Sequence, residues 1–405
     1  MEKNVNLNTN VKIASTSSLK DILRNTIRNN IRQYTMVIAL LGIWIIFQFL
    51  TKGIFISPRN LSNLFLQSAS IAILACGMVL VLVAGHIDLS VGSVVGFTGA
   101  ICAVLMTKHH FGTIPTILIA LGVGILIGIW QGFWVAYRQV PAFIVTLAGL
   151  LMYRGGVLGV TGGKTVSPMN DSFKAIGQGY LPKLTNLPFH DTTALIGLIF
   201  MIAYVIFEIN KRKSRIKYGF EVLPMNLQIA KIIGGLIVIG LVMSIMITYM
   251  GIPYAVLLLM AIIIIFTVIA EKTTFGRYVY AIGGNKEAAR LSGINIRRVN
   301  MLVFILMSVL ATVAGIVYTA RLNAATGSAG ANMELDAIAS AVIGGTSTLG
   351  GEGTIVGCII GALVMASLDN GMSLMNLGVT WQYIVKGLIL LLAVWVDIAT
   401  RKTAT

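Results

Sequence analysis

Residues that could do chemistry are sparse in this sequence, and their spacing fits no catalytic or metal site. Metal sites usually bring histidine, cysteine or carboxylate ligands together at short, characteristic intervals. The histidines lie on linkers or in predicted loops and lack such spacing; they are His86, His109, His110 and His190. We therefore expect no metal, no resident cofactor and no catalytic constellation, so the protein is not predicted to be an enzyme.

One glycine-rich stretch resembles a phosphate-binding loop but fails the pattern. Residues 159–165 read GVTGGKT, and the pattern requires a glycine at position 158, where this chain has Leu158. The stretch also lies on the side of the membrane that is predicted below to be external, away from ATP. If ATP powers this protein, we expect another chain to bind it.

Polar residues inside or beside apolar segments are better candidates for function. A charge at the bilayer centre costs about 2.5–3.5 kcal/mol on insertion scales, so such residues usually face a pathway. The stretch GHIDLSVG at 85–92 joins two apolar segments with almost no loop, so Asp88 and Ser90 could line a gate or could simply cap the next helix. A purely structural role is the alternative for every candidate. The candidate pathway or gate residues are Gln67, His86, Asp88, Ser90, Asp336 and Asn370.

A basic loop between two long apolar segments carries a second signal. It contains GGNKEAARLSG at 283–293, in which Asn285 is a good helix N-cap and Gly293 a good C-terminal stop. A helix of about two turns is marginal by itself in water, so we expect a partner surface or the membrane edge to hold it. A solvated surface helix is the alternative.

The elements that must position these residues are transmembrane helices. The chain is 57% hydrophobic and 11% charged, whereas soluble domains carry about 25% charged residues. We predict an all-α polytopic bundle of about ten or twelve spans, because two glycine-rich stretches could be two short spans or one re-entrant pair. The predicted spans are 36–56, 65–84, 90–107, 114–136, 142–160, 192–208, 228–249, 253–270, 299–320 and 379–397, with the glycine-rich stretches at 335–350 and 354–370.

The net charge of +16 is distributed as a topology signal. Lysine and arginine concentrate in the N-terminal tail, in 208–231, in 271–298 and at the C-terminus, and these segments fall on one side of the predicted spans. Both termini are therefore expected to be cytoplasmic, and nucleic acid is not an expected partner. Lys386, within the last span, is expected to extend its amine to the outer surface. We divide the chain into a polar basic cytoplasmic tail at 1–34, a transmembrane domain at 35–398 and a cytoplasmic C-terminal tail at 399–405.

Three stretches together resemble the permease subunits of bacterial ATP-binding-cassette importers for monosaccharides, the branch that includes ribose, xylose and arabinose systems. They are GHIDLSVG at 85–92, FGRYVYAIGGNKEAARLSG at 275–293 and the glycine-rich segment at 339–361. The resemblance extends over about residues 34–398. An extra basic loop and span at about 209–250 is similar to permeases of the xylose or multiple-monosaccharide type. The same subgroup is indicated by QGFWVAY at 131–137, FIVTLAGLL at 143–151 and DNGMSLM at 369–375.

The resemblance implies a transport subunit in the bacterial cell membrane, surrounded by lipid, that moves xylose or a related monosaccharide into the cytoplasm. It implies a second permease subunit, expected to form a homodimer, an ATP-binding subunit on the cytoplasmic side and an external sugar-binding protein. The short helix of the basic loop would be the coupling helix that docks on the ATP-binding subunit. Its coupling residues would be Gly283, Gly284, Asn285, Glu287, Ala288, Ala289 and Gly293.

Two other classes of membrane protein compete with this interpretation. An ion-coupled secondary transporter of a small polar solute would need an ionisable cluster deep in the spans, whereas the acidic residues here mostly lie at predicted span ends. A membrane enzyme acting on lipid-linked substrates would need paired carboxylates or a His/Asp site at one membrane face, and none stands out. Dependence on ATP rather than on an ion gradient separates the importer from the secondary transporter.

Overall fold

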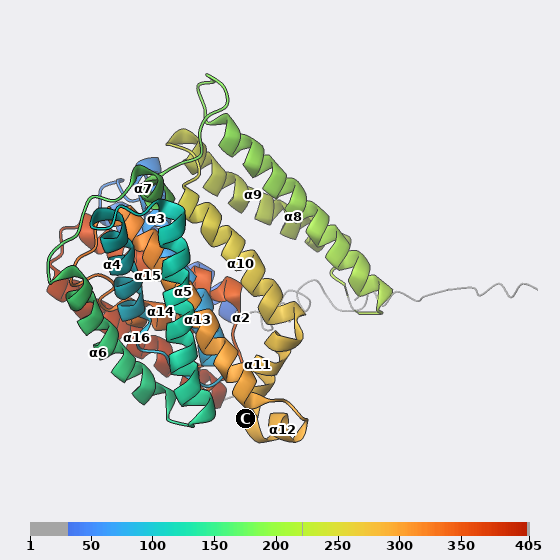
Figure 1. Ribbon diagram of the computed structural model, residues 1–405. Helices are drawn as coiled ribbons and strands as arrows, with labels where there is room; N and C mark the ends of the chain where they lie inside the picture. The colour runs from blue at the N-terminus through green and yellow to red at the C-terminus, as the bar shows by residue number, and fades with distance from the viewer. Residues whose placement is uncertain (1–30, 221, 403–405) are drawn as a thin grey trace, which may run out of the picture. The chain divides into compact units, whose positions relative to one another are not determined.

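The apolar segments fold as α-helices (Figure 1). The computed structural model describes residues 31–220 and 222–402, and no β-strand is formed within these ranges, so the predicted all-α fold is confirmed. The helices are α2 (Ile31–Leu50), α3 (Pro58–Val83), α4 (Val91–Thr107), α5 (Thr113–Gly132), the π-helical turn η1 (Phe133–Tyr137), α6 (Ala142–Thr161), α7 (Asp171–Gln178), α8 (Asp191–Lys217), α9 (Met225–Thr248), α10 (Tyr254–Lys272), α11 (Thr274–Gly284), α12 (Lys286–Leu291), α13 (Ile296–Leu322), α14 (Met333–Ile343), α15 (Ile355–Leu374) and α16 (Val379–Lys402).

The two glycine-rich stretches fold differently from one another. Within the described residues, eight helices are long and apolar enough to cross a membrane, α15 among them, and three further apolar helices are shorter. α14 has 11 residues, so its length of about 16 Å is only half of the bilayer core of about 30 Å. The segment before it, 323–332, contains no helix. The first glycine-rich stretch therefore supplies a short helix and the second a full-length one.

Several helix ends differ from the predicted spans. α2 ends at Leu50 rather than at 56, because Lys52 and Gly53 adopt positive φ angles of 53° and 91° that end the helix. α8 continues to Lys217, well beyond the predicted end at 208, because lysine and arginine are good helix formers even where hydropathy is lost. Residues 1–30 and 403–405, which belong to the predicted tails, lie outside the described residues.

The chain divides into two compact units, and the smaller comprises residues 181–252 together with residues 31–34 of the described chain; its main part is the segment 181–252. It is a hairpin in which α8 packs against α9. Glycines allow the close approach, because a Cβ at Gly235 would overlap the ring of Tyr204 and one at Gly197 would lie 3.0 Å from Cγ of Met243. The two helices bury little else, so most of their apolar side chains are exposed.

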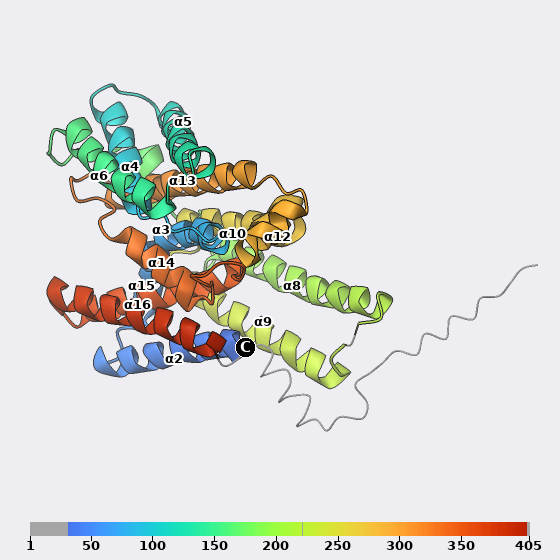
Figure 2. The ribbon, with the colours of Figure 1, turned by 90° about the horizontal axis from the view of Figure 1, so that it is seen from below.

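The larger unit, residues 35–180 with 253–402, is built around α3 and α13. α3 contacts α10, α13, α14 and α15, and Figure 2 shows it among them. α13 also packs closely on α5, where Gly124, Gly128 and Gly132 recur every four residues. A Cβ at Gly128 would lie 2.5 Å from Cα of Ile305, so this glycine stripe allows the two backbones to approach each other.

Candidate functional site

The predicted short helix is present and is capped as its sequence predicts. Oδ1 of Asn285 accepts a hydrogen bond of 2.9 Å from the backbone N–H of Ala288, which satisfies a free donor at the start of α12. Gly293 follows the helix with φ +81°, a left-handed conformation that glycine adopts without strain. The helix has six residues, or about two turns as predicted, and it follows α11, a helix that the sequence pattern did not predict.

α12 projects almost all of its side chains into solvent. Ala289 is buried, whereas Glu287, Ala288 and Arg290 are exposed, and Glu287 pairs with Arg290 at 3.0 Å on the surface. Leu291 is 82% exposed, the highest value among the exposed large apolar side chains of the described residues. A leucine so exposed on a polar helix suggests a partner surface. Sequence reasoning overlooked Leu291, although an apolar residue in this charged segment was visible.

The end of α11, just before α12, packs against the end of α3 through backbone contacts that we call the glycine joint, formed by Val83, Gly283, Gly350 and Gly351. The N–H of Gly351 donates a hydrogen bond of 2.9 Å to the carbonyl oxygen of Val83. A Cβ at Gly283 would overlap that same oxygen and would lie 2.6 Å from the nitrogen of Gly351. Gly284 differs, because a Cβ there would meet nothing within 4 Å. The joint therefore requires glycine at 283 but not at 284.

The hydroxyl of Tyr280, on α11, reinforces the same connection by donating a hydrogen bond of 2.7 Å to the carbonyl oxygen of Gly353. α11 and the loop before α15 are thus held together by a side chain as well as by backbone.

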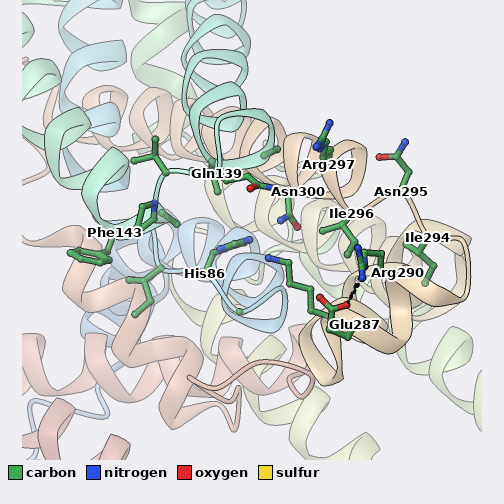
Figure 3. A pocket seen from close by; sticks show the side chains of 18 residues that line it. His86, Gln139, Phe143, Glu287, Arg290, Ile294, Asn295, Ile296, Arg297 and Asn300 are labelled. Carbon is green, nitrogen blue, oxygen red and sulfur yellow. Dashed lines mark hydrogen bonds and ion pairs between the residues drawn. The ribbon is translucent and has the colours of Figure 1, made fainter.

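A cavity of ≈ 850 Å³ lies beside α12. His86 and Asn300 face into it from different elements, and the Glu287–Arg290 pair lies at its edge (Figure 3). Burial and the positive charge of Lys286 lower the pKa of His86 to about 4, so its imidazole is neutral at pH 7. The cavity is lined by Gly85, His86, Ile87, Val135, Ala136, Gln139, Val140, Pro141, Ala142, Phe143, Lys286, Glu287, Arg290, Ile294, Asn295, Ile296, Arg297 and Asn300.

Asp88 and Ser90 form a buried polar chain that also includes Gln131 from α5. Oδ1 of Asp88 accepts hydrogen bonds from the N–H and the hydroxyl of Ser90, at 2.8 and 2.7 Å. Nε2 of Gln131 donates to the Ser90 hydroxyl at 2.7 Å, and its Oε1 has no partner in the structure. Neither Asp88 nor Ser90 caps α4 through its side chain, so the simple capping alternative is wrong. Gln131 was visible as an amide within an apolar segment but was not proposed.

The remaining candidates lie elsewhere and form no hydrogen bonds with Asp88, Ser90 or Gln131. Gln67 is exposed on α3. The amide of Asn370 exchanges hydrogen bonds of 2.8 and 3.0 Å with that of Asn60, which links α15 to α3. This reciprocal pair indicates a structural role for Asn370.

Asp336 belongs to a cluster of three ionisable groups on three helices. Nζ of Lys386 lies 3.0 Å from Asp336 and 2.8 Å from Asp369. The expectation that Lys386 extends to the outer surface is therefore wrong, because two carboxylates bind its amine within the bundle. The cluster joins α14, α15 and α16; Asp336 lies in the first turn of α14, whereas Asp369 and Lys386 lie within α15 and α16.

Within the described ranges, no group of three or more His, Cys, Asp and Glu side chains could hold a metal ion. Cys76, Cys102 and Cys358 are all buried with free thiols, a position that cysteine often takes as a small apolar residue.

The chain matches known proteins over most of its length. Residues 60–394 match the family described as the permease component of branched-chain amino acid transport systems. The xylose transport system permease proteins XylH of Haemophilus influenzae and of Escherichia coli K12 are each 44% identical over 374 residues, which is 92% of this chain and 98% and 93% of those proteins. The ribose import permease protein RbsC of Escherichia coli K12 is 34% identical over 363 residues, 89% of this chain and 92% of that protein. None of the solved structures matches the chain significantly.

Proposed function

Because this chain belongs to the family of transport-system permease components, in its xylose-type branch, we propose that it is the membrane subunit of an ATP-driven importer that moves xylose or a related monosaccharide into the cytoplasm. ATP is hydrolysed by a separate subunit, an external binding protein delivers the sugar, and a second copy of the permease completes the pathway. The permease itself does no covalent chemistry.

The observation that carries this proposal is the geometry of α12. It is a capped helix that exposes Leu291 and an ion pair, and its base is anchored to the rest of the larger unit through the glycine joint. An exposed apolar side chain at the tip and a rigid base are what a coupling helix needs. We assign Gly284, Glu287, Ala288 and Leu291 to the docking face, and Gly283 to transmission of the movement.

The distribution of charge supports an orientation with both termini and α12 in the cytoplasm. Basic residues concentrate at 208–231 and 271–298 and at the two ends of the chain, and such residues favour the cytoplasmic side. The cavity beside α12 then opens toward the cytoplasm. Its neutral His86 and the adjoining chain of Asp88, Ser90 and Gln131 are the groups we place at the inner gate of the pathway.

Transport assays test the proposal directly. The full chain is reconstituted into proteoliposomes with the ATP-binding subunit and binding protein of its native system, and uptake of radiolabelled xylose, ribose and arabinose is measured. We expect uptake to require ATP on the side of the ATP-binding subunit and to be insensitive to protonophores and to a sodium gradient. Uptake by the permease alone, driven by a proton or sodium gradient, would contradict the proposal.

The runner-up is an ion-coupled secondary transporter, and one feature favours it. The cluster of Asp336, Lys386 and Asp369 is an intramembrane ionisable group of the kind that such transporters use. Two carboxylates share one ammonium, so a bound cation or proton would complete the charge balance. Gradient-driven uptake that Asp369→Asn abolishes would assign coupling to this cluster instead.

A further inference from the structure

The hairpin of α8 and α9 ends in a charged turn that the transport mechanism does not use. We call residues 211–220 and 222–225 the basic tip. Lys211, Lys213, Arg215 and Lys217 are all exposed there. The acidic residues nearby offset little of this charge, because Glu208 is already paired with Lys231 at 2.7 Å. Glu221 is the one further acidic residue of the sequence between 209 and 231, so the tip carries a strong positive excess.

The tip is an ordered turn rather than a loose loop. Gly219 adopts φ +71°, and its N–H donates to the carbonyl of Ile216, while the N–H of Phe220 donates to the carbonyl of Arg215. The guanidinium of Arg212 closes the turn by donating to the carbonyl of Leu223. The exposed cations are therefore presented from a fixed backbone.

The length of the hairpin places the tip at the depth of lipid headgroups. α8 has 27 residues and so measures about 40 Å, against about 30 Å for the hydrocarbon core. Its apolar side chains are exposed along the helix up to Phe207 and Ile209, and those of α9 from Met225 onward. Because lipid is the medium that accepts such faces, the last two turns of α8 emerge into the headgroup layer.

The side chains between the cations suit the same layer. Tyr218 is 69% exposed and Phe220 63% exposed. Aromatic side chains are favoured where hydrocarbon meets headgroups, and a cluster of four to eight lysines and arginines next to a span favours anionic lipids. An acidic protein surface would complement the charge but would give no reason for exposed aromatic rings beside apolar helix faces.

We propose that the basic tip is a binding site for anionic phospholipid headgroups, whose phosphates are held by Lys211, Lys213, Arg215 and Lys217 while Tyr218 and Phe220 insert beside the acyl chains. The site holds the hairpin at a fixed depth. It lies wholly within the smaller unit and does not depend on the proposed transport function.

Lipid retention by the full-length chain tests this site. The wild type and the fourfold variant Lys211→Gln, Lys213→Gln, Arg215→Gln, Lys217→Gln are placed in nanodiscs of mixed phosphatidylcholine and phosphatidylglycerol, released into detergent, and analysed by native mass spectrometry. Each cation near an anionic surface contributes about fivefold in affinity (about 1 kcal/mol), so we expect at least about tenfold weaker retention of phosphatidylglycerol, with phosphatidylcholine unchanged. Raising the salt to 1 M, where the screening length is about 3 Å, should bring the wild type to the level of the variant.

The matched control is Lys52→Gln, Lys108→Gln, Lys164→Gln, Lys183→Gln, which removes the same charge from other exposed positions. It should retain phosphatidylglycerol as the wild type does. Equal loss of phosphatidylglycerol in both variants would show an effect of net charge alone and would overturn the site. Undiminished retention of phosphatidylglycerol by the tip variant would also overturn it. So would an acidic protein that co-purifies through the basic tip in place of lipid. Unfolding temperatures within about 2 °C of the wild type would confirm that both variants are folded.

Discussion

At the residue scale, two adjacent glycines give a sharp test of how α12 is attached. Gly283→Ala would place a methyl group against the backbone of Val83 and Gly351, whereas Gly284→Ala meets no atom within 4 Å. Overpacking of this kind costs about 1–3 kcal/mol. We expect Gly283→Ala to lower the unfolding temperature in detergent, and Gly284→Ala to unfold at the temperature of the wild type. Equal behaviour of the two variants would refute the glycine joint.

A second residue-scale prediction concerns pH and His86. Its pKa is lowered to about 4 in the folded chain, below the value of about 6.5 in an unfolded chain. The unfolded state therefore binds the proton more readily, so this contribution to stability is present above pH 6.5 and is lost as the pH falls toward 4. Thermal unfolding from pH 7 to pH 4.5 should show a smaller decrease in His86→Gln than in the wild type. His109→Gln is the control, since its side chain is exposed.

At the scale of elements, Lys386 holds three helices together. Lys386→Met leaves Asp336 and Asp369 without their counter-ion. Removing one partner of a buried ion pair lowers the free energy of unfolding by about 3–5 kcal/mol. We expect a loss at the lower end of this range, because the Lys386 side chain is 19% exposed. Unfolding in detergent should show this loss, and adding Asp336→Asn should restore part of it. Lys231→Met, which breaks a pair in which the lysine is 44% exposed, should cost clearly less.

The helices themselves could be predicted from the sequence because long apolar segments admit no other structure in a membrane. The ends of the helices were harder to predict from the sequence. The end of α8 shows why: hydropathy marks where the membrane ends, whereas the helix continues through Lys217 on propensity alone. The stretch 335–350 was recognisable as glycine-rich, but its glycines follow α14, which contains none and ends at Ile343 just before Gly344.

The candidate site was predictable only in its local parts. The Asn285 cap and the Gly293 stop follow from neighbouring residues and were predicted correctly. The partners of Lys386 and Ser90 lie on other helices, so the ion cluster and the Gln131 contact required the fold. The glycine joint combines residues 200 positions apart, Val83 and Gly283, and the sequence pattern gave no indication of their contact.

At the scale of the whole molecule, the orientation is open to direct measurement. The three native cysteines are buried, so single cysteines added at exposed positions can be labelled selectively. In intact cells, Lys164→Cys and Lys183→Cys should react with a membrane-impermeant maleimide from outside. Glu287→Cys and Lys213→Cys should react only after the cells are opened. The reverse pattern would invert the proposed topology.

The central claim is that α12 docks on a separate ATP-binding subunit, and co-purification from the native membrane tests it most directly. The tagged full chain is isolated in mild detergent as the wild type, as Leu291→Asp and as the control Leu184→Asp, which changes another highly exposed apolar side chain. We predict a stoichiometric ATP-binding subunit with the wild type and the control, and its loss with Leu291→Asp. A folded wild-type chain that brings no ATP-binding subunit, or one that Leu291→Asp retains fully, would contradict the account.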